Sequence, residues 1–283
     1  MGKLVCIGDS WTDDNFKSRL VDEDNYPKWP QLVADKLNMN LLNLGSSGSG
    51  NHEIFTKFTD LINETKDIDG IIIMWSEPDR VDLEVHKGYK LSSYNKVTDS
   101  GFYHYSPRRS AGNKNSPIEK YLDRLTDEQI EKNEYVGRNN FMLNVARTYH
   151  NKQDPISQTI LDMGIWSLET SWKQTMRYMF LVQSMCKGLD IKYLQVQGIH
   201  PFFTWQREQD YEKSLHSFLK WFQEQSYIYS IDETTFLGWP IFQEIGGFSM
   251  SHNIEKISDR DTHPNSVGHK EIANHLINKW NSM

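Results

Sequence analysis

Residues 3–10 of the sequence read KLVCIGDS, and this stretch decides the fold. Its first five residues form a mostly apolar run that is typical of a buried strand, and Gly8-Asp9-Ser10 ends the run in a polar turn. Further apolar patterns predict helices at 29–37 and from 51 onward, and strands at 41–44 and 69–75. Alternating strands and helices predict an α/β fold of three layers, with a central parallel sheet between helices.

The same alternation returns in the C-terminal third. The spacing predicts helices at about 156–187 and 205–225, strands at 191–196 and 227–231, and a last helix after His263-Pro264-Asn265. Between these parts, residues of about 80–155 are polar and tyrosine-rich, and then show helical spacing near 117–132 and 136–150. No linker separates this segment from the rest. We therefore expect residues 1–283 to form one domain with a mostly helical insertion at about 80–155.

Composition excludes several classes of protein. The 283 residues carry a net charge of −7, so no general attraction to nucleic acid or anionic lipid is expected. The longest apolar run, at 71–75, is far shorter than a membrane span, and no apolar segment follows a basic start as in a Sec signal peptide. Cys6 and Cys186 are too few for a disulfide framework. The expected location is cytoplasmic, or outside the cell by release without a Sec signal.

Three polar loops are expected at one edge of the predicted sheet. They follow the first three strands at 8–12, 45–51 and 76–80, and ligands of open parallel sheets bind outside the carboxyl ends of the strands. Ser10 stands in the first loop, and Asp261-Thr262-His263 precedes the last helix. A serine, a histidine and a carboxylate at the ends of elements match the nucleophile, general base and orienting acid of a serine hydrolase.

Three blocks together resemble the SGNH (GDSL) hydrolase family. They are Gly8-Asp9-Ser10, Asn43-Leu44-Gly45-Ser46-Ser47-Gly48, and Asp261-Thr262-His263-Pro264-Asn265 with Gly268-His269. The resemblance covers roughly 1–78 and 190–283. It implies a flavodoxin-like α/β/α fold and a serine esterase, deacetylase or lipase-like activity without a metal or organic cofactor. By position, it implies Ser10 as nucleophile, His263 as base and Asp261 as acid, with the Ser10 and Gly48 N–H groups holding the oxyanion.

The sequence departs from the family pattern in two places. The family usually places its acid three residues before the histidine, where this chain has Arg260. Asp261 is the favoured acid, since divergent relatives carry an Asp-x-His-Pro form, and Asp259 is the alternative. The third block lacks the oxyanion asparagine and reads Trp75-Ser76-Glu77-Pro78-Asp79. Ser76 and Asn51 are candidate replacement donors, although Asn51 also fits the N-cap of the second helix.

Other site types are not supported by the sequence. The Gly45-x-x-Gly48-x-Gly50 run lacks the spacing of a dinucleotide-binding turn, and no zinc motif occurs. His200 and the basic residues Arg108, Arg109 and Lys114 are read as structural or loop residues.

The predicted reaction is hydrolysis of a small acyl ester, with an O-acetylated carbohydrate or a similar polar ester as substrate. Tyrosines and a phenylalanine in the polar insertion offer flat apolar platforms for such a ligand, at Tyr89, Tyr94, Phe102, Tyr103 and Tyr105. The alternatives are a non-catalytic binding or structural protein on an SGNH scaffold, and an acyltransferase.

Overall fold

A computed structural model describes residues 2–18, 26–65, 67–78, 80–86, 102–105, 140–145, 163, 168–199, 224–226, 230–238, 250, 254–259 and 261–283. They form two compact units, one of Met1–Pro78 with Leu168–Met283 and the other of Asp79–Ser167. The first unit holds the stretch that decides the fold.

The first unit is built on a five-stranded parallel sheet. Strand β1 (Lys3–Ile7) lies between β2 (Asn40–Asn43) and β3 (Gly70–Trp75), followed by β7 (Lys192–Gln197) and the short β8 (Phe236–Leu237). Every neighbouring pair is parallel, in the order β2-β1-β3-β7-β8. This is the flavodoxin-like strand order, in which the chain reverses direction across the sheet at β1 and β3. The predicted central parallel sheet is confirmed.

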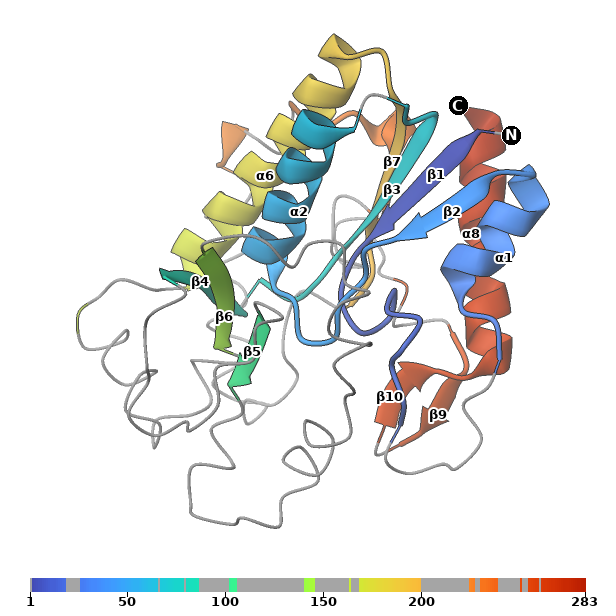
Figure 1. The fold of residues 1–283 in the computed structure, drawn as a ribbon, viewed down its shortest axis with the longest axis horizontal. Coiled ribbons are helices and arrows are strands. Elements are labelled where there is room, and N and C mark those ends of the chain that lie inside the picture. Colours follow the sequence, from blue (N-terminus) through green and yellow to red (C-terminus); the bar gives the residue numbers. More distant parts are fainter. Residues whose placement is uncertain are drawn as a thin grey trace. The chain divides into compact units, whose positions relative to one another are not determined.

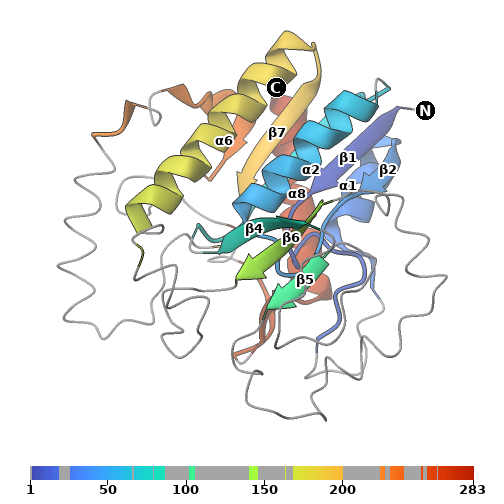
Figure 2. The ribbon, with the colours of Figure 1, turned by 60° about the vertical axis from the view of Figure 1, so that its left-hand side comes forward.

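Helices cover both faces of this sheet. Figure 1 places α1 (Trp29–Leu37) and α8 (Ser266–Ser282) on one face, and α2 (Asn51–Glu64) and α6 (Leu168–Gly188) on the other. The turned view in Figure 2 gives the same pairing of α2 with α6. The three predicted layers are therefore present.

Burial on both faces follows from the alternation of strand side chains. Leu4 and Cys6 pack into one cluster with Trp29 of α1 and Trp280 of α8, whereas Val5 and Ile7 face the opposite side and are also fully buried. Such continuous apolar strands are typical of parallel sheets, which are covered on both faces. Cys6 and Cys186 are free and buried, as expected of a chain without a disulfide framework.

The fifth strand differs from its prediction. The sequence predicts a strand at 227–231, but Ser230 and Ile231 are outside any strand and β8 comes five residues later. Residues 227–229 and the predicted helix at 205–225, except for 224 and 225, lie outside the described residues. Helix α6 begins at Leu168, within the range predicted for it.

The second unit contains a three-stranded sheet. Strand β6 (Asn140–Val145) pairs antiparallel with β4 (Val81–His86) and parallel with β5 (Phe102–Tyr105). The prediction of a helix near 136–150 is wrong over β6, because apolar residues in this short run serve sheet pairing. The helix predicted near 117–132 lies outside the described residues. In the described part of the insertion, residues 81–86, 102–105 and 140–145 form strands, so the expected helical character is not found there.

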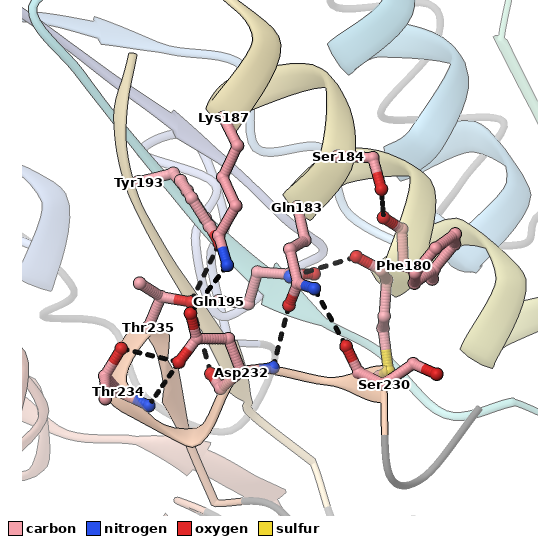
Figure 3. A network of polar contacts seen from close by, with 11 residues as sticks. Phe180, Gln183, Ser184, Lys187, Tyr193, Gln195, Ser230, Asp232, Thr234 and Thr235 are labelled. Atoms are coloured by element: carbon pink, nitrogen blue, oxygen red, sulfur yellow. Dashed lines mark hydrogen bonds and ion pairs between the residues drawn. The ribbon is translucent and has the colours of Figure 1, made fainter. Parts of the chain in front are cut away.

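A polar network fixes the short fifth strand to helix α6 (Figure 3). The Gln183 amide donates to Ser230 O at 2.8 Å and accepts from Asp232 N at 2.8 Å. Lys187 forms an ion pair of 2.7 Å with Asp232, just before the 3₁₀ turn η4 (Glu233–Thr235) that leads into β8. This ion pair, with help from Thr234, lowers the pKa of the Asp232 carboxyl to about 2.

Candidate active site

Ser10 stands in a tight turn directly after β1. Thr12 N and Asp13 N both donate to Asp9 O, at 2.9 and 3.0 Å, and Trp11 N donates to the Asp9 carboxylate at 3.0 Å. A side chain at position 8 would collide with the Thr12 hydroxyl, so the turn requires glycine there. The result is a rigid strand end that presents Ser10 at the edge of the sheet.

His263 and Asp261 come from the other end of the chain and meet Ser10. They lie on β10 (Asp261–Pro264), which forms a two-stranded antiparallel ribbon with β9 (Lys256–Ser258). His263 Nε2 is 2.8 Å from Ser10 Oγ, and His263 Nδ1 is 2.6 Å from Asp261 Oδ1. The three residues predicted from the sequence are thus brought together in one hydrogen-bonded chain.

The two-residue spacing of this acid and base has a simple structural cause. Where the pairing of β10 with β9 is irregular, Asp261 Oδ1 accepts from the backbone N of His263 at 3.1 Å as well as from its ring Nδ1 at 2.6 Å, so a local side-chain turn brings the acid to the base. Asp259 lies in the turn between β9 and β10, and its side chain is exposed. Of the two candidate acids, Asp261 is the one whose carboxylate binds the imidazole of His263.

The surroundings of Asp261 favour its charged form. Burial raises the pKa of this carboxyl, but the hydrogen bonds from His263 and Ser18 outweigh burial and bring the pKa down to about 2. The carboxylate is therefore ionised at neutral pH and can hold Nδ1–H of a neutral or charged imidazole. The His263 side chain keeps 25% of its surface exposed, which leaves the base accessible from solvent.

Three residues that contact His263 or Asp261 were not predicted from the sequence. Ser18 Oγ donates to Asp261 Oδ2 at 2.5 Å. The Phe16 ring stacks on the His263 ring, with centroids 3.9 Å apart and planes at 23°, and the Trp11 ring lies tilted at 6.5 Å. No local motif marks these residues, because each contact joins segments about 250 positions apart in the chain.

The loop after β2 brings Gly48 to the same edge. Asp13 accepts from Ser47 N at 3.0 Å and from Ser47 Oγ at 2.6 Å, which ties this loop to the loop that carries Ser10. Gly48 has φ 90°, a conformation that other residues rarely adopt. Within the described part of the chain, neither Ser10 N–H nor Gly48 N–H donates to a protein acceptor.

The two candidate replacement donors are engaged elsewhere. The Asn51 amide donates to Ser76 O at 3.2 Å and to Thr175 Oγ1 at 3.1 Å, which uses both of its N–H groups. Ser76 N donates to Asn51 Oδ1 at 2.8 Å, and Ser76 Oγ donates to Asp9 Oδ2 at 2.7 Å. These bonds pin the β3 loop in place but offer no side-chain donor to an oxyanion. Gly50, and not Asn51, is the N-cap of α2.

Other residues singled out in the sequence cannot be placed at the site. His200, Tyr89, Tyr94, Arg108, Arg109 and Lys114 lie outside the described residues. Phe102, Tyr103 and Tyr105 lie on β5 in the second unit.

The described residues show neither a cluster of metal-binding side chains nor a membrane-spanning helix. They contain no group of three or more His, Cys, Asp or Glu side chains placed to hold a metal ion. None of their helices has the length and apolar character needed to cross a membrane.

Comparisons with known proteins give structural likenesses only. No protein-family model and no curated protein matches the sequence. A G-D-S-L family protein from Desulfitobacterium hafniense DCB-2 has a TM-score of 0.42 and 12% identity, covering 99% of both chains. The acetyl xylan esterase AlAXEase has a TM-score of 0.38 and 11% identity, covering 97% of both chains. An Axe2 mutant, an acetyl-xylooligosaccharide esterase from Geobacillus, has a TM-score of 0.31 and 12% identity, covering 99% of this chain and 94% of its own.

At such identities and TM-scores, no substrate or residue role passes from these proteins to this chain. Solved structures similar to it include a GDSL-family protein and acetyl xylan esterases.

Proposed function

We propose that this protein is a serine ester hydrolase of the SGNH type. One observation carries the proposal: Ser10 Oγ, the His263 imidazole and the Asp261 carboxylate form a continuous hydrogen-bonded chain with links of 2.8 and 2.6 Å. A serine hydroxyl is a poor nucleophile until a neighbouring base takes its proton, and the base must itself be oriented. The geometry supplies both requirements.

Acylation begins when Ser10 Oγ attacks the ester carbonyl carbon and passes its proton to His263 Nε2. Asp261 accepts the Nδ1–H bond and stabilises the imidazolium. The Ser10 and Gly48 N–H groups, which have no acceptor among the described residues, donate to the tetrahedral oxyanion. Collapse of this intermediate returns the proton from His263 to the leaving alcohol. A water molecule, deprotonated by the same imidazole, then attacks the acyl-Ser10 carbonyl. The bond from this carbon to Ser10 Oγ breaks, His263 returns the proton to Ser10 Oγ, and the acid is released.

The oxyanion site that we propose is smaller than the family pattern. It uses two backbone N–H donors, because the asparagine of the third block is absent and the side chains of Asn51 and Ser76 bind other groups. Loss of one donor costs roughly 10²–10³ in kcat in a serine hydrolase. We therefore expect a slow esterase.

For the substrate, we propose an O-acetyl group or another small acyl group on a carbohydrate or similar polar ester. The polar, tyrosine-rich sequence of the insertion favours a broad polar ligand over a lipid, whose acyl chain needs a long apolar groove. Turnover of an acetylated oligosaccharide should exceed that of a long-chain p-nitrophenyl ester.

The proposed function is tested by labelling and turnover. We expect the parent protein to react with a fluorophosphonate probe and to hydrolyse p-nitrophenyl acetate. Ser10→Ala should lose both properties, because it removes the nucleophile, and His263→Ala should lose turnover comparably. Both variants should unfold at the temperature of the parent within a few degrees.

Two results would contradict this function. Hydrolysis by Ser10→Ala at the rate of the parent would exclude Ser10 as the nucleophile. An unlabelled, inactive parent would favour a binding or structural protein that has kept the scaffold.

A further inference from the structure

Two residues of the segment after the nucleophile contact the acid–base pair. Ser18 Oγ lies 2.5 Å from Asp261 Oδ2, and the Phe16 ring stacks on the His263 ring at 3.9 Å between centroids. Ser18 is 9% exposed and the Asp261 side chain 12%, so the contact between hydroxyl and carboxylate is partly buried. The segment that follows Ser10 therefore contacts both His263 and Asp261, the proposed base and acid.

The hydrogen bond from Ser18 completes the set of contacts on the carboxylate. Asp261 Oδ1 accepts two bonds from the same residue, one from His263 Nδ1 at 2.6 Å and one from His263 N at 3.1 Å. Both bonds act on one oxygen, and the terminal torsion of an aspartate is broad. A bond on Oδ2 restricts rotation of the carboxylate and keeps Oδ1 aimed at Nδ1.

We propose that Ser18 is a positioning residue for this site: its hydroxyl fixes the Asp261 carboxylate against His263. This inference rests on the proposed function. Ser18 acts through Asp261 and takes no proton from Ser10. Because Asp261 and His263 are only two residues apart, both contacts from His263 fall on Asp261 Oδ1. The Ser18 contact on Oδ2 is therefore the one that fixes the rotation of the carboxylate. Phe16 supports the same arrangement by packing on the plane of the imidazole.

The first test separates kcat from KM. Ser18→Ala should lower kcat for p-nitrophenyl acetate by about tenfold and leave KM nearly unchanged, because a hydrogen bond to a charged group is lost while the substrate contacts remain. Ser18→Thr keeps the hydroxyl and should restore most of the rate. The matched control is Ser258→Ala, since Ser258 Oγ accepts from Asp261 N at 3.1 Å and does not bind the carboxylate in that contact. We expect this control to keep the kcat of the parent.

A double-mutant cycle tests whether Ser18 works through Asp261. In an Asp261→Asn background, Ser18→Ala should cost nearly nothing further, because the carboxylate that it positions is gone. An equal loss in both backgrounds would overturn the proposal, as would an unchanged kcat in Ser18→Ala or an effect on KM alone.

One readout is independent of turnover. In NMR titrations of the carboxyl carbon, Ser18→Ala should raise the pKa of Asp261 from about 2 toward the ordinary value of 3.8, and Ser258→Ala should not. If the parent proves inactive but this shift appears, the proposed function fails while the Ser18–Asp261 contact stands. If the parent is active and the shift is absent, the positioning role of Ser18 is wrong.

Discussion

At the scale of single residues, the identity of the acid is the sharpest question. Asp261 Oδ1 lies 2.6 Å from His263 Nδ1, whereas the Asp259 side chain is exposed. We expect Asp261→Asn to lower kcat by about 10⁴-fold, because an amide in this position favours the wrong imidazole tautomer. The matched variant Asp259→Asn should change kcat little. Both are measured with p-nitrophenyl acetate on folded protein, and the opposite ranking would make Asp259 the acid.

Site residues could be predicted from the sequence where their immediate neighbours form a recognisable pattern. Those without such a pattern were missed. Ser10 ends a strand in a glycine turn, and His263 precedes a proline and a helix, so each could be singled out by its neighbours. Ser18 has no such signal, since its contact with Asp261 spans 243 positions. Asn51 was predicted as a helix cap, but its position beside Ser76 and Thr175 gives its amide three buried partners.

At the scale of elements, two side chains of α6 bind the segment that precedes β8. We expect them to contribute unequally to the free energy of unfolding. Gln183 is 7% exposed and satisfies two backbone groups, at Ser230 and Asp232, whereas Lys187 pairs with Asp232 with 53% of its side chain exposed. Gln183→Ala should lower the free energy of unfolding by about 1–3 kcal/mol, because backbone groups lose their partners. Lys187→Ala should cost less than about 1 kcal/mol. Urea unfolding measures both, and a larger loss for Lys187→Ala would contradict this ranking.

These contacts also explain why the fifth strand was predicted in the wrong place. The residues at 227–231 have the composition of a strand, but β8 is only two residues long and offers almost no pattern to read. Its position depends on pairing with β7 and on the bond between Thr235 Oγ1 and Tyr193 OH, at 3.0 Å. Such tertiary contacts override local strand propensity.

At the scale of the whole molecule, the layered architecture was predictable because it repeats. The first two apolar strands, β1 and β2, are each followed by a helix, α1 and α2, and this alternation has few stable arrangements other than a covered parallel sheet. The insertion has no such repeat. Its strand β6 pairs with β4 almost 60 positions earlier, and the apolar residues of its sequence do not reveal that pairing.

Acid stability is a property of the whole fold, and the buried His269 of α8 contributes to it over a defined pH range. Its side chain is 2% exposed, and Nδ1 accepts from Trp29 N at 3.2 Å. Burial lowers the pKa of His269 to about 3, and the nearby charges of Lys28 and His263 act in the same direction. Below about pH 6.5 the unfolded chain therefore binds a proton that the folded chain refuses, so stability falls with falling pH by about 1.4 kcal/mol per unit until about pH 3.

His269→Gln isolates this effect, because an amide oxygen can accept from Trp29 N and does not titrate. Between pH 7 and pH 5, urea unfolding should show the parent losing about 2 kcal/mol more than the variant. The depressed pKa values of Asp261 and Asp232, both about 2, act at lower pH, because a carboxylate with a lowered pKa costs stability only as pH falls through about 4. Other histidines are common to both proteins and cancel. Parallel pH profiles for the parent and the variant would mean that His269 takes up a proton in the folded protein, and would contradict this prediction.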